Sequence, residues 1–466
     1  MSFPAYTAYK DSGVEWLGDV PAHWTLHKLK HIARFSGGGT PSRDNLIYWN
    51  GNIPWISPKD MKVELIISAE ESITAEGLQN STTSLVPPGA ILIVVRSGIL
   101  KHTIPAAINK VEVALNQDMK ALRFDPKLAI GKFFLRWIQG FNDQLLHAWL
   151  KQGATVESIE QDYLSDTTIP LPDFSEQRKI VNFLDHETAR IDALIEEQQR
   201  LIELLKEKRQ AIISHAVTKG LDPTVPKKDS GVEWLAEVPA HWVVIKLGLV
   251  TSERCDGPFG SALKSDHYTD EGVRVIRLQN IKSGWFNNTD SAFIDSEYFF
   301  SSINKSDVLP GDVLIAGLGD EKNPVGRACV APGNLGSAMV KADCFRFRLL
   351  SDVALSKFVA LQLTSGAVAD AGRLSTGSTR SRIPLSSMST RLIALPPIAE
   401  QKAVIEFVQE IDQQLDSLFS EAKCGIELLQ ERRSALISAA VTGKIDVRGW
   451  QPPTTAASPE LAQEAV

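Results

Sequence analysis

Polar, glycine-rich segments lie between the apolar runs of this chain, and their side chains are of the types that contact nucleic acids. Arginine, lysine, asparagine and glutamine hydrogen-bond to base edges, whereas hydroxyl groups and backbone amides in glycine-rich loops suit phosphate oxygens. For any single residue the alternative is an ordinary solvated loop. As a set, we expect DNA contacts from Thr40, Ser42, Arg43, Lys59, Asp60, Arg96, Lys101, Lys151 and Thr155, and then from Ser261, Lys264, Gln279, Asn280, Arg373, Thr379, Arg380 and Arg382.

Motifs for catalysis are missing from the sequence. There is no GxxxxGK[ST] phosphate loop, no GxSxG, no HExxH, and no [DNS]PP[YFW] tetrapeptide of the amino-methylating DNA methyltransferases. The four cysteines (Cys255, Cys329, Cys344 and Cys424) stand apart, which favours isolated thiols over a zinc site. We expect no catalytic residue, no metal and no cofactor on this chain. An enzyme with an unrecognised centre is the alternative.

The chain is a duplication, and this accounts for the paired polar segments. Residues 10–24 (KDSGVEWLGDVPAHW) recur as residues 228–242 (KDSGVEWLAEVPAHW), and residues 202–218 recur as residues 426–442. Each half therefore has a leader, a globular domain and a helical segment. The first leader contains Trp16 and Trp24, and the second contains the corresponding Trp234 and Trp242. Because both copies keep these tryptophans, we interpret them as packing anchors of the repeated frame. The globular domains have diverged, which suggests one scaffold that carries two different readers.

Apolar residues recur with a 3.5-residue period after each globular domain, which predicts a coiled coil. Asp412, Arg209 and Arg433 interrupt this seam. An antiparallel pairing of the two helices within the chain is the simplest packing, and two separate helical hairpins are the alternative. The predicted interface residues are Leu184, Ile191, Ile195, Ile202, Leu205, Ile212, Val408, Leu415, Phe419, Ile426, Leu429 and Leu436.

The globular domains combine short strands with amphipathic helices. Strands are expected at residues 91–95 and 313–316, and at residues 53–57, which correspond to residues 273–277. Helices are expected at residues 132–150 and 355–369. Lys59-Asp60 then corresponds to Gln279-Asn280, and Ala154-Thr155 to Ser378-Thr379. The predicted class is α+β: two target-reading domains separated by a long antiparallel two-helix coiled coil, with pseudo-twofold symmetry.

These patterns divide the chain into successive segments. They are a leader (1–24), a first reader (25–171), a helix (172–220), a linker with the second leader (221–242), a second reader (243–395), a second helix (396–443) and a tail (444–466). The net charge of −7 does not argue against DNA, because residues 25–170 carry 15 Lys+Arg against 14 Asp+Glu and residues 243–393 carry 17 against 15. No signal peptide or membrane span is predicted, so we expect a cytoplasmic protein.

Several of these motifs together resemble the specificity subunits of type I restriction–modification systems. The resemblance lies in residues 38–42 (GGTPS) with 48–55 (YWNGNIPW), in 256–261 (DGPFGS) with 275–281 (VIRLQNI), and in the helix entries 170–177 and 395–401. The leader is also typical of that family. The match covers the chain up to about Trp450, and only the combination of motifs is specific.

The resemblance implies a non-catalytic subunit that binds double-stranded DNA, two methyltransferase subunits and up to two restriction subunits, and no membrane. Each reader would recognise one half of a bipartite, asymmetric site, and the helices would set the gap. S-adenosylmethionine, ATP and Mg²⁺ would be bound by the partners, in a phage-defence system that methylates adenine. A scaffold that binds only proteins is a third hypothesis.

Overall fold

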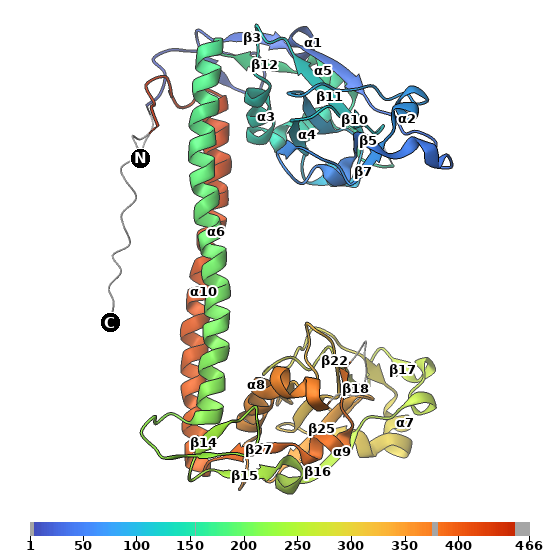
Figure 1. The fold of residues 1–466 in the computed structure, drawn as a ribbon, viewed down its shortest axis with the longest axis vertical. Coiled ribbons are helices and arrows are strands. Elements are labelled where there is room, and N and C mark those ends of the chain that lie inside the picture. The colour runs from blue at the N-terminus through green and yellow to red at the C-terminus, as the bar shows by residue number, and fades with distance from the viewer. Residues whose placement is uncertain (1–3, 154, 375–380, 453–466) are drawn as a thin grey trace. The chain divides into compact units, whose positions relative to one another are not determined.

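The computed structural model describes residues 4–153, 155–374 and 381–452, without the side chains of Ser261 and of residues 368–374. The chain divides into two compact units. Unit 1 comprises residues up to Gln199 together with those from Cys424 onward, and unit 2 runs from Arg200 to Lys423. Each unit therefore contains one leader, one reader and part of both long helices (Figure 1).

Unit 1 begins with the leader hairpin of β1 (Tyr9–Asp11) and β2 (Asp19–Pro21). Strand β3 (Thr25–Lys28) pairs with β12 (Thr168–Leu171), so the first and last strands of this reader lie side by side. Helix α1 (Leu29–Ile32) then enters the reader. This closure places the reader's two ends next to the start of the long helix.

The first reader contains two sheets. The five-stranded sheet has the order β4 (Ala33–Gly37), β11 (Met119–Phe124), β8 (Ile91–Val94), β9 (Ala106–Asn109), β6 (Leu65–Ile66). The three-stranded sheet has the order β10 (Ala114–Leu115), β5 (Trp49–Ile56), β7 (Glu71–Ile73). All four residues of β8 are buried, as expected for an apolar run bounded by turn residues.

The helices of the first reader are α2 (Ala75–Gln79), α3 (Gly131–Gly140), α4 (Asn142–Trp149) and α5 (Gln161–Asp166). The prediction of one helix over residues 132–150 is wrong, because the chain breaks at Phe141 between α3 and α4. Gly140 lies against the backbone of Ser438, where a Cβ atom would come within 3.0 Å of its Cα. The close contact with the long helix accounts for a glycine at the break.

Unit 2 repeats the leader as β13 (Lys227–Asp229) and β14 (Glu237–Pro239), and β15 (Val243–Lys246) pairs with β27 (Leu392–Leu395). One sheet has the order β16 (Thr251–Asp256), β25 (Cys344–Leu349), β21 (Val313–Ala316), β23 (Ala328–Val330). Another has the order β17 (Tyr268–Thr269), β19 (Phe293–Ile294), β18 (Val273–Ile276), β24 (Ala338–Val340), β20 (Asp307–Val308). The other elements are β22 (Leu318–Gly319), β26 (Ser381–Arg382), α7 (Ser296–Tyr298), α8 (Ser356–Leu374) and α9 (Leu385–Thr390).

The two readers share a common frame. Strand β11 pairs antiparallel with β4 as β25 does with β16, and β10 pairs parallel with β5 as β24 does with β18. The predicted correspondence of residues 53–57 with 273–277 is therefore confirmed, since Trp55 faces Ala114 and Val275 faces Met339. The α+β class and the duplication are confirmed as well.

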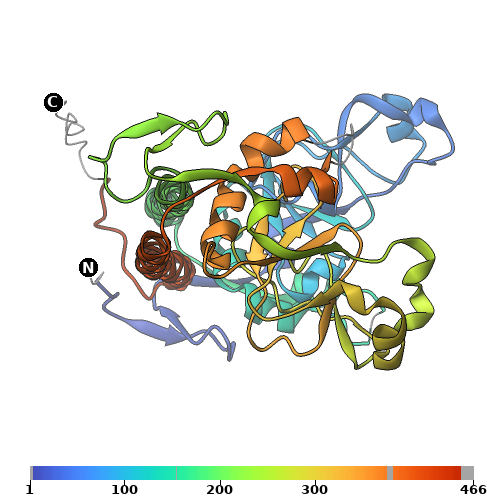
Figure 2. The same cartoon turned by 90° about the horizontal axis from the view of Figure 1, so that it is seen from below.

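The long helices are α6 (Phe174–Lys219) and α10 (Ile398–Val441), which Figure 2 shows nearly end on. In unit 1 the Arg433 guanidinium lies 2.8 Å from the Asp192 carboxylate, and in unit 2 Arg209 lies 2.8 Å from Asp412 and 2.7 Å from Asp416. In each unit an α6 segment thus runs antiparallel to an α10 segment. The alternative of separate hairpins is wrong, and the residues that interrupt the seam form these ion pairs.

The predicted seam residues are all at least half-buried. Burial of an apolar side chain contributes roughly 1.5–3 kcal/mol, so this seam is a large stabilising term. The buried residues are Leu184, Ile191, Leu205, Val408 and Leu415, and the half-buried ones are Ile195, Ile202, Ile212, Phe419, Ile426, Leu429 and Leu436. Within the described parts of the chain, no helix is both long enough and apolar enough to cross a membrane.

Both leaders fasten onto the start of a long helix. In unit 1 the Glu176 carboxylate accepts hydrogen bonds from Tyr6 Oη (2.5 Å) and Trp24 Nε1 (3.1 Å) and contacts His23 Nε2 (2.8 Å). In unit 2 the equivalent Glu400 accepts from Trp242 Nε1 (2.9 Å) and contacts His241 Nε2 (2.8 Å). Trp24 and Trp242 are fully buried, so the expected packing role of these two tryptophans is confirmed.

Candidate nucleic-acid interface

Loops of the first reader meet at one end of its five-stranded sheet. Strand β11 pairs antiparallel with both β4 and β8, and its start lies beside their ends, with Lys120 opposite Gly37 and Met119 opposite Val94. The loop after β4, the loop after β8 and the turn before β11 therefore project from the same end of the sheet. Five of the nine residues of this reader that we expected to contact DNA lie on the loops after β4 and β8, namely Thr40, Ser42, Arg43, Arg96 and Lys101.

The loop after β4 is held by glycine and by tryptophan. A Cβ atom on Gly38 would collide with the carbonyls of Leu115 and Asn116, so only glycine permits this approach. The indole Nε1 of Trp55 donates to Gly39 O (3.0 Å). The hydroxyl of Thr40 then donates to the side-chain carbonyl of Gln117. The backbone of this loop is thus fixed while Thr40 and Ser42 stay exposed.

Arg43 is exposed but engaged. Its guanidinium stacks 3.9 Å from the centre of the Trp49 ring and forms a two-pronged ion pair with Glu71, one prong measuring 2.9 Å. Hydrogen bonds from Arg43 hold the pKa of Glu71 below its usual value. The stacking and the ion pair hold the Arg43 guanidinium in one orientation, and Glu71 partly neutralises its positive charge.

Asp60 shapes the next turn and does not reach outward. Its carboxylate accepts from the backbone amides of Ser57 (2.8 Å) and Glu70 (2.7 Å) and from the Ser57 hydroxyl (2.8 Å). Lys59 is left exposed at the apex of the 3-10 turn Pro58–Asp60. Of the predicted pair, Lys59 is placed to contact a ligand, and Asp60 positions it.

A second group of basic residues surrounds the segment that follows α4. Arg96 forms an isolated β-bridge with Ser158, and the backbone amide of Ser97 donates to Glu157 O (3.0 Å). The turn that carries Lys101 and the loop that carries Lys151 are thereby brought together. Lys101 and Lys151 lie within weak ion-pair range of acidic neighbours, at 3.6 and 3.5 Å. Arg96, Lys101, Lys151 and Thr155 are all exposed.

The second reader has an equivalent group of loops at one end of its sheet. A Cβ atom on Gly257 would collide with the backbone of Val340 and Lys341, which match the strand positions that Gly38 contacts in the first reader. Arg382 pairs with the Asp343 carboxylate at 2.8 Å. Burial raises the pKa of Asp256 to about 6. Because β22 pairs with β26, with Leu318 opposite Arg382, this group of loops extends toward Gln279.

The Gln279-Asn280 turn repeats the architecture of Lys59-Asp60. Asn280 Oδ1 accepts from the amide of Arg277 (2.8 Å), as Asp60 does from Ser57, and its Nδ2 donates to the carbonyls of Asn287 (2.9 Å) and Asp290 (2.8 Å). Asn280 is fully buried, so the expectation that it contacts DNA is corrected, because its amide is used within the turn. Gln279 stands exposed at the apex, where Lys59 stands in the first reader.

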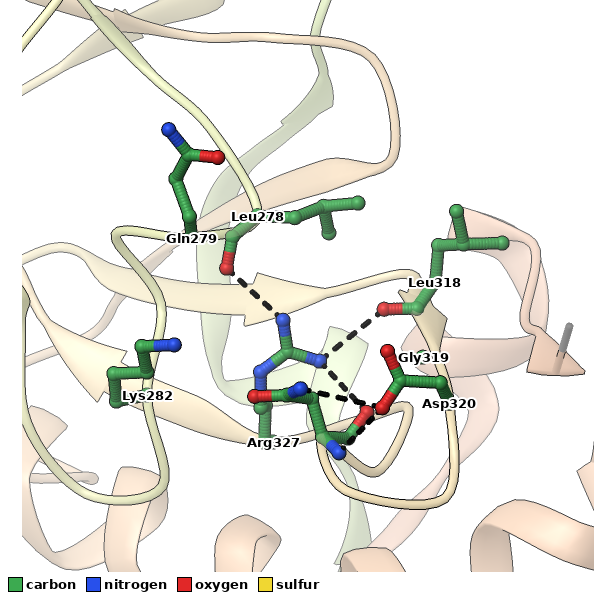
Figure 3. A pocket seen from close by; sticks show the side chains of 8 residues that line it. Leu278, Gln279, Lys282, Leu318, Gly319, Asp320 and Arg327 are labelled. Carbon is green, nitrogen blue, oxygen red and sulfur yellow. Dashed lines mark hydrogen bonds between the residues drawn. The ribbon is translucent and has the colours of Figure 1, made fainter. Parts of the chain in front are cut away.

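Next to this turn is a hollow of about 260 Å³ lined by Gln279, Lys282, Asp320 and Arg327, among others (Figure 3). Arg327 is buried, and its guanidinium donates to the carbonyls of Leu278 (2.9 Å) and Ile281 (2.8 Å) on one loop. It also donates to the carbonyl of Leu318 in β22 (3.2 Å) and to that of Asn323 (3.1 Å) on the loop that follows this strand. Burial lowers the pKa of this arginine. Arg327 therefore joins the two loops that form the walls of the hollow.

The remaining predicted residues are not part of these groups. Lys264 is exposed on a segment anchored by the buried Leu263 beside the second sheet of this reader, and no contact joins it to the hollow within the described residues. Ser261 and Arg373 have no described side chains, and Thr379 and Arg380, like Ser378, lie outside the described residues. No group of three His, Cys, Asp or Glu side chains in the described chain is placed to hold a metal ion.

Sequence reasoning missed three residues, one in the first reader and two in the second. Gln117 is exposed and bonded to Thr40, and the polar run of residues 116–118 just before β11 was the available signal. Lys282 follows the Gln279 turn by three residues and lines the hollow. Arg327 gave no local signal, because its role depends on two loops that lie far apart in the sequence.

Comparisons with known proteins agree on one family. Residues 21–205 match the family model of the type I restriction modification DNA specificity domain. The chain is 39% identical over 198 residues to the specificity subunit of the Escherichia coli type I restriction enzyme EcoR124I/EcoR124II, a match that covers 42% of this chain and 46% of that subunit. This chain therefore spans under half the length of that relative.

Two further relatives match almost end to end. The putative type I restriction enzyme MjaX specificity subunit of Methanocaldococcus jannaschii is 24% identical over 93% of this chain and 96% of its own length. A chain solved in work on complex assembly and conformational transition of the type I R-M system superimposes with a TM-score of 0.66 at 18% identity, covering 91% of this chain and 99% of that one. At 18% identity, this superposition shows that the two chains share a fold.

Proposed function

We propose that this chain selects the DNA sequence on which partner subunits act, because it is similar to the specificity subunits of type I restriction–modification systems. Each reader recognises one half of a bipartite, asymmetric site. The readers themselves catalyse nothing. Adenine methylation and restriction are carried out by methyltransferase and restriction subunits, which bind S-adenosylmethionine, ATP and Mg²⁺, and the complex works in the cytoplasm.

One observation carries this proposal: the same structural position holds different exposed side chains in the two readers. Lys59 and Gln279 occupy equivalent apices, each fixed by the residue that follows it. Glutamine suits bidentate contact with adenine, and lysine suits guanine or a phosphate. Two unlike apices on one duplicated frame are what an asymmetric site requires.

The long helices supply the spacer in this proposal. Helix α6 is continuous over 46 residues, which corresponds to about 69 Å at 1.5 Å per residue. Its antiparallel pairing with α10 and the ion pairs of Arg209 and Arg433 support a stiff rod. A rod of fixed length would set the unread gap between half-sites, because half-site spacing follows protein geometry.

Exposed leucines off the seam support docking of two partner subunits on the helices. In unit 1 these are Leu194 and Leu428, and in unit 2 they are Leu201, Leu204 and Leu418. Exposed apolar side chains of this size on a helix favour burial by a partner. Because both units carry such residues, we propose one methyltransferase subunit per unit, and up to two restriction subunits beyond them.

A domain exchange tests the proposal. Residues 243–393 are replaced by the equivalent segment of another such chain, and methylated adenines are mapped in a host that carries the partner subunits. We expect one half-site to change while the other half-site and the gap stay the same. A change in both halves, or in neither, would contradict modular reading. Methylation by the purified chain alone with S-adenosylmethionine would instead show that it is an enzyme.

A further inference from the structure

Two arginines face each other at the far end of the first reader's sheet. Arg34 on β4 and Arg123 on β11 are directly opposite in the antiparallel register, and both are exposed. Directly opposed residues project from the same face of a sheet, and like charges in that position repel each other. Within the described residues, neither guanidinium has an ion pair or a side-chain hydrogen bond. The pair is thus an uncompensated concentration of positive charge.

The second reader shows that the frame does not need this pair. At the equivalent register position Glu253 on β16 faces Arg348 on β25, and their side chains form an ion pair of 2.7 Å. The strand pairing is the same, but the first strand carries a carboxylate in place of an arginine. The sheet is therefore compatible with either residue, and the arginine in the first reader calls for an anion from outside the chain.

A hollow of about 620 Å³ surrounds the arginine pair and is lined by Lys30, His31, Arg34, Arg123 and Asp125, among others. Lys30 is paired with Asp166 at 2.6 Å, so most of the free positive charge belongs to the two arginines. The Asp125 carboxylate accepts from the backbone amide of Lys127 (2.9 Å) and makes no ion pair with them. The hollow is open, polar and basic, which suits an anion carried on a large partner.

We propose that Arg34 and Arg123 bind backbone phosphates of the DNA that flanks the half-site read by the first domain. The inference rests on the proposed DNA-reading function. The planar guanidinium fork matches a phosphate, and two adjacent forks match consecutive phosphates. Six residues of extended chain separate Arg34 from Thr40, about 20 Å at most, which is about six base pairs along a duplex. The site thus lies within reach of DNA next to the bases that the loops touch.

Charge reversal at position 34 is the sharpest test, because Arg34→Glu recreates the pairing found in the second reader and should leave the melting temperature unchanged or raise it. The full chain, assembled with its methyltransferase subunits, is titrated with two duplexes. One ends at the last base pair of the first half-site, and the other extends ten base pairs beyond it. Lys110→Glu is the matched control, since Lys110 is exposed and follows β9 near the opposite edge of the sheet.

We expect the wild-type complex to prefer the longer duplex several-fold and to lose that preference in Arg34→Glu and in Arg123→Gln. On the longer duplex, the plot of the logarithm of the binding constant against the logarithm of the salt concentration should become less steep. Its slope should decrease in magnitude by about one for each phosphate contact removed. Base preferences within the half-site should not change, and Lys110→Glu should behave as wild type. Arg123→Gln keeps the test valid if the reversed variant does not fold.

Equal flank preference and equal salt slopes in the wild type and both arginine variants would overturn the inference. So would variants that fail to assemble with the methyltransferase in the absence of DNA, because the arginines would then bind an acidic protein surface. A wild-type complex that binds neither duplex specifically would refute the proposed function itself, and the inference with it.

Discussion

Gln279 offers the most direct test of how the second reader distinguishes bases. Replacing it by alanine removes the exposed amide and leaves the turn intact, because that turn is held by Asn280 and by the backbone carbonyl of residue 279, which accepts from Asn287 Nδ2 (3.2 Å). The backbone that positions the neighbouring residues should therefore stay as it is. Any loss of recognition then reports on the glutamine side chain alone.

The size of the effect follows from the contact that is lost. A bidentate side-chain contact with a base discriminates by about 1–3 kcal/mol. The Asp290 carboxylate also accepts a hydrogen bond from the Gln279 side chain, and this bond must be given up when DNA binds. We therefore expect the lower part of that range, about 1–2 kcal/mol, which is a loss of about 5- to 30-fold in discrimination.

Competition binding of the assembled complex measures this loss. Duplexes in which each position of the second half-site is substituted in turn are compared for the wild type and for Gln279→Ala. One position should become tolerant in the variant, the salt slope should not change because glutamine is neutral, and the first half-site should be read as before. A variant with the wild-type profile at every position, or with both half-sites weakened equally, would refute the reasoning.

Three further predictions concern the frame. Glu176→Gln should lower the free energy of unfolding by about 3 kcal/mol and Glu400→Gln by about 1 kcal/mol, because Glu176 is more buried and has one more partner; urea titration of the two variants measures the difference. Asp256 has a folded-state pKa raised to about 6, above its ordinary 3.8, so its ionisation costs stability as the pH rises through 6; Asp256→Asn should melt higher than wild type at pH 7 and no higher at pH 4. Deleting residues 193–199 with the facing residues 426–432 removes about 10 Å of paired helix, so mapped methylation sites should show a gap shortened by up to about three base pairs; an unchanged gap would exclude the spacer role.

The helical frame was predictable from the sequence because its signal is periodic and repeated. Residues such as Leu184 and Leu415 follow a heptad that any amphipathic helix must bury, and the duplicated leaders mark both domain boundaries. The antiparallel pairing follows from the repeat as well, because each arginine of the seam meets an aspartate only in that direction.

The candidate site was predictable only in part, because exposure at a turn depends on contacts distant in sequence. Lys59-Asp60 and Gln279-Asn280 were correctly matched, but the sequence alone does not distinguish the apex residue from the residue that holds it. Arg327 acts between loops some forty residues apart and so escapes local analysis. The break at Phe141 depends on the approach of the long helix to Gly140, which the helical period does not reveal.

Comparison of the two halves separates what the fold requires from what recognition varies. The buried contacts of Glu176 and Glu400 with the leaders recur nearly unchanged, and Asp60 and Asn280 fix their turns in the same way. The side chains that differ, Lys59 from Gln279 and Arg34 from Glu253, stand on those fixed supports and are exposed. Since an exposed substitution on a rigid support costs little stability, the residues that face DNA can change while the frame stays folded. A duplicated frame with interchangeable exposed residues is therefore a physical route to a new asymmetric site without a new fold.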